Sequence, residues 1–178
     1  SDPAPQAKAE AAPAPPSIPK SLQGVGQLIN DPAKSDWYFG GTAGSWTTQT
    51  DTQIFGTNVT RIAATKVDAQ PHELFVSIPT NAGISEGDDI VIAVAAKTEA
   101  TDGTDATARI KLRIEEAQEP YAGFGDNTIT VGTKWQLLRV QTRATKALAE
   151  GKGQLALHLA HGVQTLDLGP VFVIKKGQ

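Results

Sequence analysis

Cysteine and methionine are both missing from the 178 residues of this sequence. Without cysteine the protein has no disulfide framework, no thiolate nucleophile and no thiolate ligand for a metal ion. The residue with which translation starts is also absent, so we expect a processed or trimmed chain. These absences exclude thiol chemistry and direct attention to sites built from other residue types.

An excess of positive charge and a long hydrophobic run are missing as well. The net charge is −3, which argues against non-specific binding to nucleic acid or to anionic membranes. No apolar run approaches the roughly 20 residues that a membrane-spanning helix needs. We therefore expect a soluble chain with one ordinary domain, which at this length folds without a disulfide or a metal ion.

The first 17 residues are rich in proline and alanine and contain no large apolar side chain. Such a composition cannot bury enough surface to offset its ordering entropy. We predict a disordered tether over residues 1–17 and a folded domain over residues 18–178. A tether of this kind commonly follows a removed signal peptide or separates two domains, which favours a secreted or periplasmic location.

Beyond the tether, apolar and polar residues alternate in short runs. Residues 109–115 alternate strictly, which places Ile110, Leu112 and Ile114 on a buried face of a strand. Gly169-Pro170 interrupts the last of these runs, where we expect a bulge or a sheet edge. Further strands are predicted over residues 37–46, 58–66, 74–78, 89–95, 135–142, 154–159 and 165–174.

Helical patterns are weak by comparison. Residues 144–150 are long enough for one or two helical turns, and residues 22–29 are the other candidate. About eight strands separated by turn signals are typical of an antiparallel sandwich. The sequence therefore predicts an all-β fold, an antiparallel β-sandwich of the jelly-roll type.

Four short motifs occur in a fixed order along this predicted sandwich. They are Ile29-Asn30-Asp31 with Asp36-Trp37, Glu86-Gly87-Asp88 before the strand that ends at Lys97, Pro120-Tyr121, and Lys134-Trp135 leading to residues 164–171. Together they resemble carbohydrate-binding modules of families four, nine and twenty-two, which have a galactose-binding-like jelly roll. The resemblance covers roughly residues 22–175.

This resemblance implies a polysaccharide-binding or oligosaccharide-binding module without catalytic activity. Such modules support a linked or partner glycan-active enzyme, or a surface complex, often in bacteria that export many such proteins. Related modules often hold a structural calcium ion, but here Gly169-Pro170 stands where an acidic ligand is expected. We therefore expect no cofactor and disfavour a structural calcium. Aromatic residues make up only 6% of the chain, too few for a broad stacking platform on crystalline cellulose.

Sugar recognition needs an exposed aromatic ring flanked by polar groups. Two rings, Trp46 and Tyr121, lie in polar segments that favour exposure, whereas Trp37 and Trp135 lead into apolar alternation and are predicted to be core residues. We place the site on a single sheet face with these two exposed rings at its rim; the alternative is a merely solvated face. The predicted carbohydrate-binding residues are Trp46, Tyr121, Arg61, Lys97, Arg113 and His158.

The sequence contains little evidence for a metal site or a catalytic site. The two rings of His158-x-x-His161 point to opposite faces of a strand, so a metal site is not expected there. Neither a G-x-S-x-G elbow nor a phosphate-binding loop occurs. Two alternatives remain: a structural or adhesive cell-envelope sandwich without a sugar ligand, and a jelly-roll polysaccharide lyase or glycosidase that uses Tyr121 with an arginine or a histidine.

Overall fold

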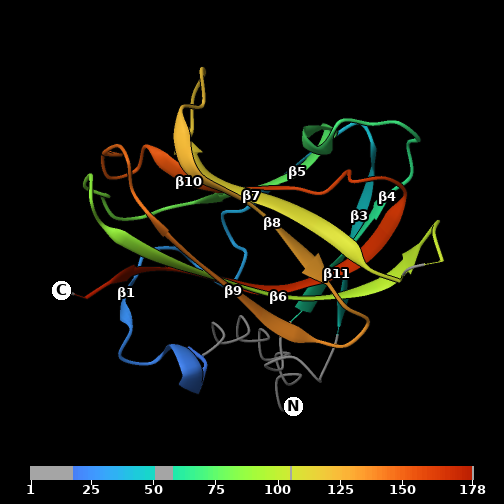
Figure 1. Cartoon of the computed structure of the whole chain (residues 1–178), viewed down its shortest axis with the longest axis horizontal. Coiled ribbons are helices and arrows are strands. Elements are labelled where there is room, and N and C mark those ends of the chain that lie inside the picture. Colours follow the sequence, from blue (N-terminus) through green and yellow to red (C-terminus); the bar gives the residue numbers. More distant parts are fainter. Residues whose placement is uncertain (1–17, 51–57, 105, 178) are drawn as a thin grey trace, which may run out of the picture.

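Two antiparallel sheets pack face to face in the structure, a computed structural model that describes residues 18–50, 58–104 and 106–177 (Figure 1). The tether predicted over residues 1–17 lies outside the described residues. The first sheet contains β1 (Gly26–Leu28), β3 (Gly44–Thr50), β4 (Asn58–Ala64), β6 (Asp89–Thr101), β9 (Gln136–Arg143) and β11 (Gln164–Lys176). The second contains β2 (Tyr38–Gly41), β5 (Leu74–Pro79), β7 (Ala108–Glu116), β8 (Gly123–Val131) and β10 (Gly153–His158).

The strand order fixes which side chains become neighbours. The six-stranded sheet has the order β3-β4-β11-β6-β9, and β1 also pairs with β11. The five-stranded sheet has the order β2-β5-β10-β7-β8. Most neighbouring strands are far apart in the sequence, so each sheet assembles side chains that no local sequence pattern connects. The all-β antiparallel sandwich predicted from the sequence is confirmed.

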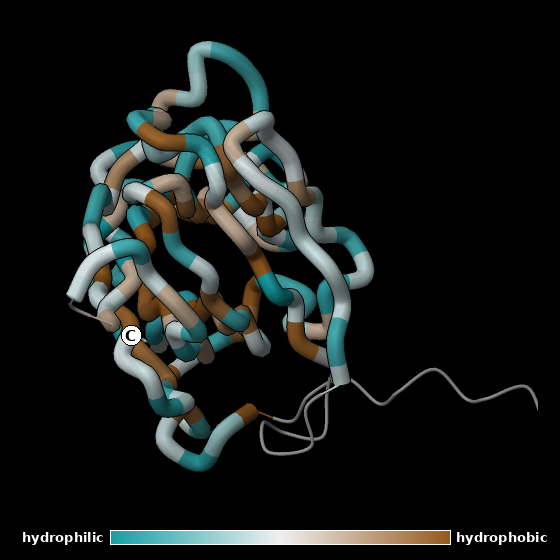
Figure 2. The backbone as a smooth tube through the Cα atoms, turned by 90° about the vertical axis from the view of Figure 1, so that its right-hand side faces the viewer, coloured by the Kyte–Doolittle hydropathy of each residue, from teal (hydrophilic) through white to brown (hydrophobic). Residues whose placement is uncertain are grey.

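Each sheet turns one face toward a shared core, as the period-two alternation predicts. Ile110, Leu112 and Ile114 of β7 are fully buried in this core. Each such side chain contributes about 1.5–3 kcal/mol relative to leaving it exposed. Figure 2 shows hydrophobic and hydrophilic stretches following one another along the strands. The predicted break at Gly169-Pro170 is confirmed, because the pairing of β11 with β6 shifts register between Leu168 and Val171.

Three local predictions are wrong. Residues 37–46, predicted as one strand, form β2 and β3 in different sheets, because the backbone turns after Gly41 with its φ of +107°. Residues 144–150 form no helix, and residues 22–29 contain β1 preceded by the short 3-10 turn η1 (Lys20–Leu22). In addition, residues 123–131, which are absent from the predicted strands, form the edge strand β8.

The outer faces of the two sheets differ. On the six-stranded sheet, Leu22 packs with Val25 and Leu28 against Phe172 and Ala93, so the N-terminal segment covers part of that face. On the five-stranded sheet the outer face is hollowed. No helix among the described residues is long and apolar enough to cross a bilayer.

Candidate binding groove

A groove of about 590 Å³ crosses the outer face of the five-stranded sheet. Four strands of that sheet contribute to it, together with the 3-10 turn η2 (Pro71–Glu73) and the loop after β7. The lining residues are Tyr38, His72, Phe75, Ser77, Arg113, Glu115, Ala117, Tyr121, Gln154, Ala156 and His158.

One row of side chains explains why the sheet is hollowed. Strand pairing aligns Tyr38 of β2, Ser77 of β5, Ala156 of β10 and Arg113 of β7 across the sheet. The two middle positions carry small side chains, which keep the floor of the groove low. The two outer positions carry long side chains, which stand up as its flanks. Alternation along each strand turns these side chains away from the core.

Aromatic rings border the groove at two places. Tyr38 is 64% exposed and lies 5.9 Å from the ring of Phe75 in a tilted arrangement. Tyr121, on the loop after β7, is 43% exposed. Exposed rings of this kind offer an apolar face to the C–H surface of a sugar, while the tyrosine hydroxyls remain able to hydrogen-bond.

A chain of polar contacts runs along the groove beside Ala156. The side-chain amide of Gln154 donates to Glu115 Oε2 at 2.9 Å, and the other oxygen of Glu115 lies 3.4 Å from Arg113 Nη1. Arg113 Nε lies 3.1 Å from Asp126 Oδ1. Burial raises the pKa of Glu115, although Gln154 and Arg113 favour its ionised form. The positive charge of Arg113 thus faces two carboxylates.

Other polar groups of the groove remain available to a ligand. Among the described residues, no protein partner is found for the Ser77 hydroxyl or for the side-chain oxygen of Gln154. Ser77 forms part of the floor of the groove, and Gln154 also lines the groove. A pyranose hydroxyl can donate to the Gln154 oxygen and exchange hydrogen bonds with Ser77. The groove therefore combines rings and hydrogen-bonding groups as sugar recognition requires.

Two histidines meet at the end of the groove near Phe75. The rings of His72 and His158 lie 6.3 Å apart, edge to face. Burial lowers the pKa of His158 to about 4, and the positive charge of Lys111 adds to this effect. His158 is therefore a neutral hydrogen-bonding group near pH 7, not a cation.

Because its pKa is lower in the folded state, His158 links folding to pH. The unfolded chain binds a proton at this side chain between pH 6.5 and 4 while the folded chain does not. We expect the free energy of unfolding to fall by about 3 kcal/mol through this window as the pH decreases. Urea unfolding at several pH values measures it. His158→Gln should flatten the curve, and a wild-type slope in that variant would contradict the assignment.

The structure brings together three of the six predicted site residues. Tyr121, Arg113 and His158 line the groove. Arg61 and Lys97 lie on the six-stranded sheet, on the opposite side of the molecule's core. Trp46 lies on the edge strand β3 of that same sheet, where it pairs with the core residue Ile62 of β4. The prediction of one shared face is therefore wrong. Arg61 and Arg113 both point outward from their strands, but strand pairing places these strands in different sheets.

The side chain of Trp46 sits at the lateral edge of the sandwich. It is 38% exposed and stacks on Phe39 with ring centroids 6.2 Å apart. Trp37 is buried in the core, as predicted. Trp135 is only half-buried and packs against Val59 and Ala95 on the outer face of the six-stranded sheet, so the prediction that it is a core residue is wrong.

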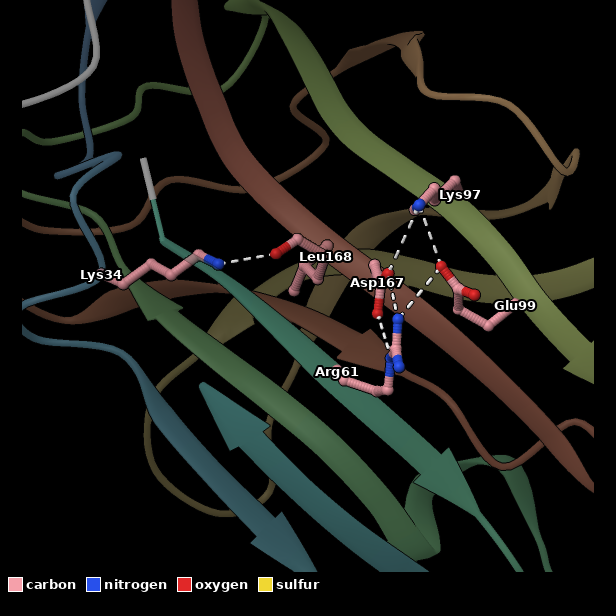
Figure 3. Close-up of polar contacts among 6 residues, drawn as sticks. All are labelled: Lys34, Arg61, Lys97, Glu99, Asp167 and Leu168. Atoms are coloured by element: carbon pink, nitrogen blue, oxygen red, sulfur yellow. Dashed lines mark hydrogen bonds and ion pairs between the residues drawn. The ribbon is translucent and has the colours of Figure 1, made fainter. Parts of the chain in front are cut away.

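Arg61 and Lys97 belong to an ion-pair network on β4, β6 and β11 (Figure 3). At its centre Asp167 is only 1% exposed and accepts hydrogen bonds from Arg61 Nε at 2.8 Å and Nη2 at 3.0 Å. Glu99 contacts both cations, at 3.2 Å from Arg61 and 3.0 Å from Lys97. Burial of Asp167 opposes its ionisation, but its contacts with Arg61, Glu99 and Lys97 together outweigh that cost and leave the pKa of Asp167 below its usual value.

This network also bears on calcium. Both carboxylate oxygens of Asp167 accept hydrogen bonds from Arg61, and the neighbouring Gly169-Pro170 offers no carboxylate. Among the described residues, no group of three or more acidic or histidine side chains could hold a metal ion. The two histidines of His158-x-x-His161 also lie apart, because His158 lines the groove and His161 lines a separate hollow. The residues near Asp167 do not fit a structural calcium site.

Several groove residues were not predicted as site residues. Their outward alternation is visible in the sequence, since Phe75 and Ser77 alternate with Leu74, Val76 and Ile78. Alternation alone does not show which strands lie side by side, and so it could not assemble the set. The missed residues are Tyr38, His72, Phe75, Ser77, Glu115, Ala117, Gln154 and Ala156.

Neither a family model nor a curated protein matches the sequence. Solved structures do resemble the fold. A CBM4 protein has a TM-score of 0.58 at 14% identity, covering 87% of this chain and 98% of that one. The second N-terminal cellulose-binding domain of β-1,4-glucanase C from Cellulomonas fimi has a TM-score of 0.64 at 13% identity, covering 88% and 99%. The CBM22-1 xylan-binding domain of Xyn10C from Paenibacillus barcinonensis has a TM-score of 0.55 at 13% identity, covering 86% and 97%. At these identities the similarity establishes a shared fold.

Proposed function

We propose that this domain is a non-catalytic polysaccharide-binding module whose ligand lies in the groove of the five-stranded sheet. One observation supports this most directly: Tyr38 and Arg113 flank a floor made by Ser77 and Ala156, with Tyr121 at the rim. The fold adds support, because similar structures include modules described as cellulose-binding and xylan-binding.

The charges of the groove favour a neutral glycan over an acidic one. A uronate needs an unpaired cation, and Arg113 already faces Glu115 and Asp126. His158 offers no alternative cation at neutral pH, because burial lowers its pKa to about 4. A neutral polysaccharide can instead use the rings and the groups at Ser77 and Gln154.

We further propose that the domain works outside the cytoplasm, in support of a glycan-degrading enzyme or surface complex. A similar fold makes up 28% of a Clostridium thermocellum chain that joins a CBM22-1 module to a GH10 module. In that chain the module is joined to an enzyme, and the Pro/Ala-rich composition of residues 1–17 is suited to a linker in a similar attachment.

Affinity electrophoresis against neutral and acidic polysaccharides tests the proposed function. Retarded migration in a neutral glucan or xylan gel, without release of reducing ends or unsaturated products, is the expected result. Product release would instead support a lyase or glycosidase, since Tyr121, Arg113 and His158 lie in the same groove. No retardation in any gel would favour a structural or adhesive sandwich.

The rings of the groove should carry a large share of the affinity. We expect Tyr38→Ala and Tyr121→Ala each to weaken binding about tenfold, the equivalent of losing one ring contact of about 1.4 kcal/mol. Isothermal titration with a soluble oligosaccharide measures this. Trp46→Ala is the matched control, because Trp46 is exposed but lies outside the groove. Tenfold weaker binding in this control would place the ligand elsewhere.

A further inference from the structure

We infer that Arg113 is a positioning residue, which acts on the ligand by holding the ring of Tyr121 at the rim of the groove. The inference rests on the proposed function of the groove. It assigns to Arg113 a role different from direct contact with the sugar, which its place among the predicted binding residues would suggest.

The backbone at Tyr121 needs support. Its φ of +55° lies in the left-handed region, which residues other than glycine rarely adopt. Its amide donates to the carbonyl of Gln118 at 2.8 Å, which closes a turn. The amide of Glu116 donates to the carbonyl of Ala122 at 2.9 Å, which closes the whole loop at its base. These two bonds shape the loop but do not attach its outer part to the sheet.

Arg113 makes that attachment from the flank of the groove. Its Nη1 donates to the backbone carbonyl of Tyr121 at 2.9 Å. The same guanidinium contacts Glu115 at 3.4 Å and Asp126 at 3.1 Å. A planar guanidinium with fixed donor directions suits such a junction, whereas a lysine ammonium is a point charge on a flexible stem. The hydrogen bond ties the carbonyl of Tyr121 to β7, while the ion pairs with Glu115 and Asp126 hold the guanidinium in place.

The side chain of Arg113 is also less exposed to solvent than that of Tyr121. It is 22% exposed, whereas Tyr121 is 43% exposed. A ligand on the groove therefore meets the ring of Tyr121 more readily than the less exposed guanidinium of Arg113. Fixing the ring before binding removes an ordering cost that the ligand would otherwise have to offset.

Fluorine NMR can test the positioning directly. The chain has two tyrosines, and both line the groove, so 3-fluorotyrosine labelling gives one resonance at each place. We expect Arg113→Lys to move the Tyr121 resonance toward that of a solvent-exposed tyrosine and to leave Tyr38 unchanged. Arg113→Gln should act in the same way. Lys111→Gln is the matched control, since it removes a positive charge from β7 and leaves the Tyr121 carbonyl bonded.

Affinity measurements complete the test. We expect Arg113→Lys to weaken oligosaccharide binding about as much as Tyr121→Ala, about tenfold, and the double variant to bind no worse than either. Effects that multiply in the double variant would show direct contact and overturn the inference, as would an unchanged Tyr121 resonance. If no glycan binds the wild type, the proposed function fails, and the fluorine spectrum still decides the role of Arg113.

Discussion

Asp167→Ala is expected to lower the free energy of unfolding by about 2–4 kcal/mol, because the partly exposed cations Arg61 and Lys97 lose the buried carboxylate that they bind. Asp167 is 1% exposed and joins β4 to β6 through Arg61 and Lys97. Removing its carboxylate leaves Arg61 and Lys97 facing each other with Glu99 as their remaining anion. Urea unfolding at pH 7 measures the loss.

Glu99→Gln is the matched control for this change. Glu99 contacts the same two cations, but its side chain is 30% exposed and more readily hydrated. We expect a loss of no more than about 1 kcal/mol, as for exposed ion pairs. Equal losses in the two variants would show that burial of Asp167 does not set the effect. At urea concentrations below its unfolding midpoint, the Asp167→Ala protein should still bind glycan. The ion-pair network around Asp167 lies on the six-stranded sheet, and the groove lies on the other sheet.

The sequence correctly predicted which strand residues point into the core, because the alternation of apolar and polar residues is a local property of each strand. The inward positions of β7, β5 and β10 follow directly from the period of two, and the core residues Ile110, Val76 and Leu157 are buried as expected. Outward positions follow from the same pattern. Arg113 and His158 could therefore be placed on an outer face before the structure was known.

Strand pairing is what the sequence left undetermined. Arg61 alternates with core residues on β4 just as Arg113 does on β7, yet β4 pairs with β11 and β7 pairs with β10. Nothing local distinguishes the two arginines, so they were assigned to one face. The hollow itself depends on Ser77 and Ala156 lying side by side, and 79 positions of sequence separate them in the chain.

Turns and edge strands account for the remaining differences. Gly41 with its positive φ allows the chain to leave one sheet and enter the other, which the polar pattern of residues 37–46 does not reveal. Strand β8 is an edge strand with several exposed polar residues, so its alternation is weak. Residues 144–150 have a helical composition, but Ala144 and Leu148 are buried in the core and their backbone bonds to Asp88 and Ile84. Tertiary contacts outweigh a seven-residue propensity.

Lys34 is a half-buried lysine with a perturbed pKa that none of the sequence patterns indicated. Its Nζ donates to the carbonyl of Leu168 at 2.6 Å (Figure 3). It also donates to Thr60 Oγ1 at 3.3 Å. The same nitrogen lies 5.5 Å from the ring centroid of Trp37. Loss of hydration lowers the pKa of Lys34 to about 7, although the charge of Asp167 acts in the opposite direction.

This lowered pKa of Lys34 determines the direction in which the free energy of unfolding changes with pH. Between pH 7 and 10.5 the unfolded chain holds a proton on Lys34 that the folded chain has released in part or fully. The unfolded state binds more protons in this window, so the free energy of unfolding rises with pH. Below pH 7 both states are protonated and the folded state bears the full cost of the buried charge. We expect Lys34 to contribute a rise of roughly 3–5 kcal/mol between pH 7 and 10.

Lys34→Met isolates this contribution, because other groups also titrate in the same window. Methionine keeps an unbranched stem of similar length beside Trp37, but it carries no charge and cannot donate to the carbonyl of Leu168. Losing that donor lowers the free energy of unfolding by about 1–3 kcal/mol at every pH. Removing the charge raises the free energy of unfolding only at pH values where Lys34 of the wild type is protonated. The wild type should therefore gain stability relative to Lys34→Met as the pH rises from 7 to 10. Urea unfolding of both proteins gives this difference, and parallel curves would show that the Lys34 ammonium is hydrated in the folded protein.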